Sequence, residues 1–208
     1  WQSYASSCRG LVCRAMCKRS LVLPTKSKCR MGVASVMTPQ LRPITSKLGS
    51  TPRLNALASF VPKATRVFVD VGTNHAILPI LVARRTHAKL SIGIDRSPQA
   101  LLEAERRVRR SHCARRIELR LGDGLSDLAS NEVEVICLAG LAPVNMVKIL
   151  TGGLAVMQGH AVRLLLHPLG SSEQPRAFLA ANDFELVVDT TVMSRGRDCT
   201  LLVAERQA

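Results

Sequence analysis

Aromatic side chains are scarce in this chain of 208 residues, which contains one Trp, one Tyr and four Phe. A core without aromatic bulk has to be filled by Leu, Val, Ile and Ala, the residues typical of a parallel sheet covered by helices on both faces. No uninterrupted apolar run reaches the roughly 18 residues that a membrane-spanning helix needs. The sequence therefore favours an α/β domain and predicts no membrane partner.

Acidic residues are missing from the first third of the chain, where Asp70 is the first to occur. Twelve Lys and Arg precede it, whereas seventeen Lys and Arg face fifteen Asp and Glu in the remainder. Most of the net charge of +14 therefore belongs to the N-terminal part. This distribution is not that of a uniformly basic nucleic-acid-binding domain.

Residues 1–50 combine Arg, Lys and Ser with scattered hydrophobic residues and no acid. This composition is typical of a mitochondrial or chloroplast transit peptide, so we expect a disordered targeting segment and a location in the mitochondrial matrix or chloroplast stroma. The alternative is a basic arm that stays on the mature protein and contacts RNA phosphates. The chain begins with Trp1, as expected of a fragment or a processed form. The folded domain is expected over residues 51–208.

The seven cysteines show no regular spacing. Cys13 and Cys17 form the only close pair, and no second pair or histidine stands at the spacing that zinc ligands use. An odd number of scattered cysteines favours free thiols in a reducing compartment, and the sequence predicts no metal site.

Apolar runs and helical periodicities alternate along residues 51–208. The sequence predicts strands at 66–71, 90–94, 117–121, 133–138 and 162–166, and helices at 53–60, 76–85, 98–110, 144–157 and 173–182. Ser97 is the expected N-cap of the helix 98–110, with Leu101, Leu102 and Val108 facing inward. Two final strands, at 184–192 and 199–205, are predicted to form a hairpin. The alternation predicts a doubly wound, Rossmann-like and mostly parallel sheet, to which the hairpin adds one antiparallel strand.

Several predicted strands end in glycine or an acid, at the edge where doubly wound sheets bind ligands. These ends are Asp70 to His75, Gly93 to Asp95, Gly122 to Gly124, and the pair Ala139-Gly140. Because the carboxyl ends of parallel strands meet at one edge of the sheet, we expect these residues to gather round a single ligand.

The residue types at these ends suit an adenosyl ligand. Gly72 has no Cβ, so the chain can turn sharply and approach a ligand closely. Asp95 stands 23 residues after Gly72, a separation at which an acid on the next strand reaches ribose hydroxyls. Asp123 is expected to accept a hydrogen bond from an adenine amino group. Asp70 is expected to order the amides of its turn or to meet the cationic end of the cofactor.

The competing nucleotide is NAD, whose fingerprint G-x-G-x-x-G needs three glycines. Thr73, Asn74 and His75 follow Gly72 here, so the close approach of a pyrophosphate to a helix N-terminus is not provided. An acid beside the glycine turn suits S-adenosylmethionine, which carries no phosphate. A single such acid is explained as well by the capping of a turn or helix, but acids at three successive strand ends favour a site.

The stretch from Arg53 to Pro62, followed by Asp70-Val71-Gly72-Thr73-Asn74-His75-Ala76-Ile77-Leu78-Pro79, resembles the bacterial TrmK-type tRNA adenine-N1 methyltransferases. Further similar segments are 93–95, 120–125, 138–140 and 201–205, so the resemblance covers residues 48–205. It implies a class I methyltransferase fold that binds S-adenosylmethionine and methylates an adenine N1 in tRNA or other structured RNA. The cofactor residues predicted from the strand ends and the resemblance are Asp70, Gly72, Thr73, Asn74, His75, Asp95, Asp123, Gly124, Ala139 and Gly140.

The chain departs from that family at three turns. It has Thr-Asn-His at 73–75 where the family has Ser-Asp-His, Gly-Leu-Ala-Pro at 140–143 where the family has Gly-Met-Gly-Gly, and His-Pro-Leu at 167–169 where the family has Gln-Pro-Asn. Bacterial members also have a helical C-terminal region that helps to hold tRNA, outside the part that the resemblance covers. The second hypothesis is therefore a catalytically degenerate protein that keeps the fold and acts as an RNA-binding or ribosome-associated component.

Methyl transfer to adenine N1 needs no strong general base, because N1 has an available lone pair. Catalysis then comes from aligning nucleophile, methyl and sulfur, and from electrostatics. The predicted substrate pocket is the turn 140–145 with His167 nearby, and His167 is the single catalytic candidate, with satisfying a strand end as its alternative role. RNA contact is expected at Arg106, Arg107, Arg109, Arg110, Arg115 and Arg116, for which a solvated helix face is the other interpretation.

Overall fold

The computed structural model describes residues 48–129 and 132–208. Most of the predicted targeting segment lies outside the described residues, together with Cys8, Cys13, Cys17 and Cys29. Leu48 is buried in the core, and its carbonyl accepts a hydrogen bond of 3.0 Å from Arg107 Nη1. Leu48 therefore packs as part of the folded domain.

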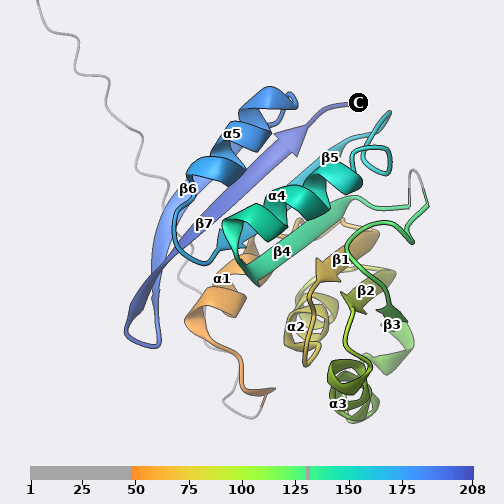
Figure 1. The fold of residues 1–208 in the computed structure, drawn as a ribbon. Coiled ribbons are helices and arrows are strands. Elements are labelled where there is room, and N and C mark those ends of the chain that lie inside the picture. The colour runs from red at the N-terminus through yellow and green to blue at the C-terminus, as the bar shows by residue number, and fades with distance from the viewer. Residues whose placement is uncertain (1–47, 130–131) are drawn as a thin grey trace, which may run out of the picture. The chain divides into compact units, whose positions relative to one another are not determined.

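The described residues form one seven-stranded sheet in the order β3-β2-β1-β4-β5-β7-β6 (Figure 1). Its strands are β1 Val67–Val71, β2 Leu90–Asp95, β3 Ile117–Leu121, β4 Val135–Leu141, β5 Val162–Pro168, β6 Glu185–Ser194 and β7 Arg197–Arg206. Strands β1 to β5 pair in parallel, whereas β7 runs antiparallel to both β5 and β6. The doubly wound sheet with one antiparallel strand is thus confirmed. Its order reverses between β1 and β4, which is the switch point where such sheets bind ligands.

Helices cover both faces of the sheet, and each face has its own core. Helices α1 Pro52–Ser59, α2 Ile77–Arg85 and α3 Pro98–Arg109 pack on one face, and α4 Pro143–Gly152 and α5 Glu173–Ala181 lie together over the other (Figure 1). Side chains alternate along β1, so that Val69 and Val71 join the core under α4 and α5 while Phe68 joins the core under α1 and α2. The same alternation places Asp70 on the face of the sheet that Phe68 occupies.

Helix α3 begins as its sequence predicts. Ser97 Oγ accepts a hydrogen bond of 3.2 Å from the amide of Ala100, and Pro98 occupies the first turn. The prediction that Leu102 faces inward is wrong, because its side chain is 49% exposed. Val108 is buried as predicted, together with Ala104, and this spacing of four residues defines the stripe that faces the sheet.

The hairpin at the C-terminal end of the fold closes more tightly than the sequence predicts. Ser194 pairs with Arg197, so only Arg195 and Gly196 form the turn. Both have positive φ, 53° and 73°. Two such residues make the kind of turn whose twist matches that of the adjoining strands. The tight turn fixes Arg195 and Arg197 at the tip of the hairpin.

Cys113, Cys137 and Cys199 are free thiols, as predicted. Within residues 48–129 and 132–208, no helix is both long and apolar enough to cross a membrane. No group of three His, Cys, Asp or Glu in these ranges is arranged to hold a metal ion.

Candidate functional site

Two cavities lie side by side at the carboxyl edge of the sheet, and Gly72, Asn74 and Leu141 line both of them. The cavity of about 660 Å³ is bounded by helix α4, and we call it the α4-side cavity. The cavity of about 1160 Å³ is bounded by Arg53 and Leu54 of helix α1, and we call it the α1-side cavity. Both therefore open at the place where the order of the strands reverses.

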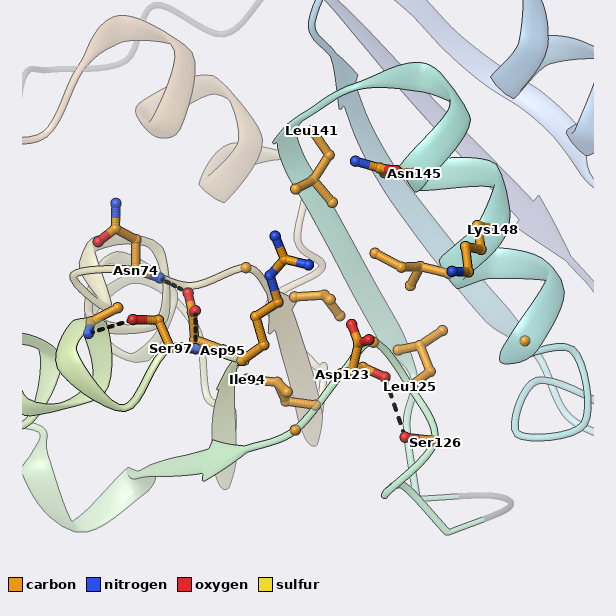
Figure 2. A pocket seen from close by; sticks show the side chains of 18 residues that line it. Asn74, Ile94, Asp95, Ser97, Asp123, Leu125, Ser126, Leu141, Asn145 and Lys148 are labelled. Carbon is orange, nitrogen blue, oxygen red and sulfur yellow. Dashed lines mark hydrogen bonds between the residues drawn. The ribbon is translucent and has the colours of Figure 1, made fainter.

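The α4-side cavity brings together residues from the ends of three strands. Asp95 and Asp123 line it from β2 and from the turn after β3, and Asn145 and Lys148 of α4 face them across the cavity (Figure 2). The predicted cofactor residues that line it are Gly72, Asn74, Asp95, Asp123 and Gly124. Two neighbouring strand ends thus contribute one acid each to the same cavity.

Two backbone amides hold the carboxylate of Asp95 in place. Its Oδ2 accepts a hydrogen bond of 2.9 Å from the amide of Asn74, and its Oδ1 accepts one of 3.0 Å from the amide of Ser97. Asn74 reaches Asp95 because its backbone is left-handed, with φ of 50°. Each carboxylate oxygen accepts more than one hydrogen bond, so Asp95 orders its turns and still offers acceptors to a ligand.

The turn after β3 places the carboxylate of Asp123 beside helix α4. Within the described residues, the side chain of Asp123 accepts no hydrogen bond, and only its carbonyl receives one, of 3.2 Å, from Ser126 Oγ. Gly124 has φ of 76°, and a Cβ there would lie 3.2 Å from Cγ2 of Ile149. Glycine therefore lets this turn pack closely against α4 while Asp123 points into the cavity (Figure 2).

Asp70 lies in the α1-side cavity, apart from the other two acids. Because side chains alternate along β1, Asp70 lies on the same face of the sheet as Phe68, toward helix α1. The prediction that all three acids surround one ligand overlooked this alternation. Its side chain is almost fully buried, and Thr73 Oγ1 donates a hydrogen bond of 2.8 Å to its Oδ2. Burial raises the pKa of Asp70 to about 7, and the negative charge of Asp95 adds to this rise, whereas the hydrogen bond from Thr73 and the charge of Arg53 oppose it.

The remaining predicted residues also line the α1-side cavity, which is bounded by the ends of β4 and β5 and by the tip of the β6–β7 hairpin. They are Thr73, His75, Ala139, Gly140 and the catalytic candidate His167. The predicted site thus divides into two groups of residues on the two sides of Gly72 and Leu141.

The hydrogen bond of His167 fixes its tautomer. Nδ1 lies 3.0 Å from the carbonyl of Thr200, and because a carbonyl only accepts, Nδ1 carries the proton. Burial lowers the pKa of His167, and the nearby charge of Arg53 lowers it further. The ring is therefore neutral at pH 7 and satisfies the backbone of β7, while its catalytic role stays a prediction.

The arginine cluster predicted to contact RNA is largely engaged with the protein. Arg106 and Arg109 form ion pairs with Glu103 and Glu105 on the same helix. Arg107 donates to the carbonyl of Leu48, and Arg116 donates to backbone carbonyls near the end of α2. The arrangement favours the interpretation as a solvated helix face.

Several basic residues in the cavities were not predicted as site residues. Arg96 and Lys148 line the α4-side cavity. Arg53, Arg195 and Arg197 line the α1-side cavity. Arg53 carries one signal in the sequence, because a cation in the first turn of a helix opposes the helix dipole. Arg195 and Arg197 carry none, since only the order of the strands brings the hairpin tip to this cavity.

Comparison with known proteins places the chain in a family. A family model described as a methyltransferase domain matches residues 50–202. The chain is 28% identical over 160 residues to the tRNA (adenine(22)-N(1))-methyltransferase of Bacillus subtilis, a match that covers 77% of this chain and 66% of that protein, which is less than two thirds of its length.

Solved structures show the same relationship. The m1A22 tRNA methyltransferase TrmK of B. subtilis superposes with a TM-score of 0.71 at 28% identity, covering 76% of this chain and 67% of the other. Streptococcus pneumoniae Sp1610, solved in complex with S-adenosyl-L-methionine, gives a TM-score of 0.69 at 29% identity and covers 74% of this chain and 72% of the other. Since the family model matches well over half of the chain, including all five helices, the chain belongs to the methyltransferase domain family.

Proposed function

We propose that the chain is an S-adenosylmethionine-dependent methyltransferase that modifies N1 of an adenine in tRNA. The observation that carries this proposal is the pair of cavities that meet at Gly72, Asn74 and Leu141. Transfer of a methyl group requires donor and acceptor to be held on two sides of one short gap. The similarity to the B. subtilis tRNA methyltransferase supports the choice of acceptor.

The α4-side cavity fits the cofactor. Its volume of about 660 Å³ lies within the range of small-molecule sites. Asp95, fixed by two amides, suits the paired hydroxyls of a ribose, and the uncommitted Asp123 suits an amino group of adenine. Gly72, with φ of 74°, leaves its wall free of side-chain atoms. The cofactor, when bound, supplies the activated methyl group.

The α1-side cavity is the proposed place of the acceptor base. Methylation at N1 leaves a positive charge on the adenine ring, so an acid beside the ring stabilises the charge that develops. Asp70 is the buried acid of this cavity, and with a pKa of about 7 it is substantially ionised at physiological pH. The residues of the chain thus position the base and offset its charge, and no strong base is needed.

Calorimetric titration with S-adenosylmethionine, followed by methyl incorporation into tRNA, tests the proposal. The Asp95→Ala variant should lose at least about tenfold in cofactor affinity, because a hydrogen bond to a charged group contributes about 1.5–3 kcal/mol. Glu103→Ala removes an acid of α3 that lies away from both cavities and should bind the cofactor like the wild type. Absence of binding at millimolar cofactor would contradict the proposal.

A second candidate function is that of a catalytically degenerate protein, which keeps the fold and binds RNA without methylating it. The end of β4 and the turn that follows it favour this candidate. Leu141 lies between the two cavities, and its Cδ2 would be 3.5 Å from a Cβ at Gly72. Pro143 removes a backbone donor at the start of α4. A chain that binds the cofactor and RNA but transfers no methyl group, even at high enzyme concentration, would be this second kind of protein.

We also propose that residues 1–50 direct the protein to a mitochondrion or chloroplast, on the ground of their acid-free, Arg- and Ser-containing composition. A fusion of this segment to a fluorescent protein should enter the organelle, and a fusion with its Arg and Lys replaced by Gln should stay outside. Diffuse fluorescence from the unchanged segment would contradict the proposal. N-terminal sequencing of the imported protein would locate the cleavage site.

A further inference from the structure

Three arginines from two distant parts of the chain line the α1-side cavity. Arg53 lies in the first turn of α1, Arg195 in the turn of the β6–β7 hairpin, and Arg197 at the start of β7. The acids of the same cavity are Asp70 and Asp198. Within residues 48–129 and 132–208, neither acid forms an ion pair with any of the three arginines.

The side chains of these three arginines also donate no hydrogen bond to another described residue, unlike most arginines of the domain. Arg66, Arg120, Arg163 and Arg176 each form an ion pair with a glutamate or aspartate. A guanidinium carries five donors and stays charged at any pH of interest, so it needs acceptors from the protein, from water or from a ligand. Arg53 is half-buried and Arg195 and Arg197 are exposed, so water is an acceptor for them, and it is the gathering of three positive charges around one cavity that favours a ligand with negative charge.

The position of Arg53 is built into the site. A Cβ at Gly140 would lie only 3.2 Å from its Nη1, and the φ of Gly140 is 80°, so glycine makes room for the guanidinium. Burial raises the pKa of Asp70 and of Cys137 and lowers that of His167, and the nearby charge of Arg53 acts on all three groups, which lie on β1, β4 and β5. Its place in the first turn of α1 opposes the helix dipole. The stability of α1 therefore does not explain this arginine.

We propose that Arg53, Arg195 and Arg197 bind the backbone phosphates on and next to the acceptor nucleotide, and so position its base in the α1-side cavity. This inference rests on the proposed function. Adenine itself is neutral and would leave three positive charges without a partner, whereas a phosphate matches the fork of a guanidinium with two parallel hydrogen bonds. An acidic peptide offers similar charge, but the cavity also reaches Gly72 and Asn74, where the proposed acceptor base meets the cofactor.

The salt dependence of RNA binding tests the phosphate contacts. The probe is a short single-stranded RNA containing adenosine, and its affinity for the full chain is measured by fluorescence anisotropy at several salt concentrations. The triple variant carries Arg53→Gln, Arg195→Asn and Arg197→Gln, with Asn at 195 because Asn tolerates the positive φ of that residue. Each lost phosphate contact lowers the slope of log affinity against log salt by about 0.7, so the triple variant should lose up to about 2.

The matched control removes the same charge elsewhere. The control variant carries Arg106→Gln, Arg109→Gln and Arg110→Gln. These three residues lie on or just after α3, outside both cavities. This control should keep the wild-type slope within about 0.7, the value of one contact. Equal losses in the control and the cavity variant would overturn the proposal, because the effect would then be one of net charge. Tighter binding of hexaglutamate than of the RNA probe would also overturn it.

Two further measurements separate this inference from the proposed function. Cofactor binding should be unchanged in the triple variant, because none of the three arginines lines the α4-side cavity. If the wild type binds no cofactor, the proposed function fails whatever the arginines do. If it binds cofactor and RNA while the triple variant keeps the full salt slope, the phosphate contacts alone are wrong. Arg53→Lys should retain the slope of the wild type but bind the RNA more weakly, because lysine keeps the charge and loses the fork.

Discussion

The two cavities at the edge of the sheet differ in the balance of acidic and basic side chains that line them. In the α4-side cavity, Asp95 and Asp123 face the cations Arg96 and Lys148, and the acids lie at strand ends open to the cavity. In the α1-side cavity three arginines stand against Asp198 and a buried Asp70. The first arrangement suits a ligand recognised through hydroxyl and amino groups, and the second suits an anionic one. One strand, β1, contributes to both cavities, Val71 to one and Asp70 to the other, because its side chains alternate.

The largest expected effect concerns the buried acid that distinguishes the α1-side cavity. The pKa of Asp70 rises from 3.8 unfolded to about 7 folded, so the folded state binds the proton more tightly. Stability from this group is present below pH 3.8 and is lost as the pH rises through about 7. At pH 9 the loss reaches about 4 kcal/mol, from about 1.4 kcal/mol for each unit of pKa. Asp70→Asn should therefore raise the free energy of unfolding at pH 9 and change it little at pH 4, as measured by urea denaturation.

Asp123→Asn is the control for that measurement, because Asp123 is exposed in the other cavity. Its stability profile should follow that of the wild type. The same Asp70→Asn variant sharpens the functional contrast, since methyl transfer by the wild type should increase as the pH rises through about 7 and the variant should show no such rise. Parallel stability profiles for wild type and Asp70→Asn would mean that the two cavities do not differ in burial of their acids.

The next effect concerns Gly72, which lines both cavities. A valine there should lower methyl transfer about 100-fold, or about 2.7 kcal/mol in the barrier, because its side chain would fill the gap between donor and acceptor. Gly159→Val is the matched control, since Gly159 has the same φ of 74° with open space around it and lies outside both cavities. The two variants should lose similar thermal stability from backbone strain. Equal activities in the two variants would show that Gly72 does not lie between the methyl donor and the acceptor base.

A smaller effect concerns the hydrogen bond between His167 and the carbonyl of Thr200. His167→Leu leaves that carbonyl without its donor and should destabilise the fold by about 1–3 kcal/mol. His167→Gln keeps a donor and should retain most of the stability and of the methyl transfer, as measured by thermal denaturation and by incorporation into tRNA. A loss of methyl transfer in a stable His167→Gln variant would instead assign a catalytic role to the imidazole.

The sequence predicts most of the sheet because the signals of its strands are local. Apolar runs that stop at glycine or aspartate locate β1 to β4, the run of β5 stops at His167-Pro168, and the hairpin is visible from its glycine-containing connection. Helix α4 is different, because its periodicity continues to Met157 while the helix itself ends at Gly152. The carbonyls of Ile149 and Leu150 bond to the amide of Gly153, and the chain then leaves the helix. Glycine inside an apolar run is a weak stop signal, and tertiary packing decides it.

The division of the site is harder to predict than the site itself. Acids at strand ends indicate a ligand, but which face of the sheet each acid serves depends on the orientation of its strand against the helices. The meeting of Arg53 with the hairpin tip depends on the order β4-β5-β7, which no local pattern encodes. Asn74 stands where the resemblance implies an acid, and its contact with Asp95 does not depend on its side chain. Its backbone amide, rather than its side chain, holds Asp95.

The smallest expected effect concerns the arginines of α3, which the sequence suggests for RNA and the structure pairs with glutamates. Arg106 and Arg109 form exposed ion pairs with Glu103 and Glu105, and such pairs contribute about 0.2–1 kcal/mol. Arg106→Gln and Arg109→Gln should therefore each change the free energy of unfolding by less than about 1 kcal/mol and leave the affinity for RNA unchanged. Urea denaturation and anisotropy measure the two quantities. If either variant lost as much RNA affinity as Arg53→Gln, the RNA-binding surface would extend from the α1-side cavity to α3. An RNA phosphate would then compete with Glu103 and Glu105 for these guanidinium groups.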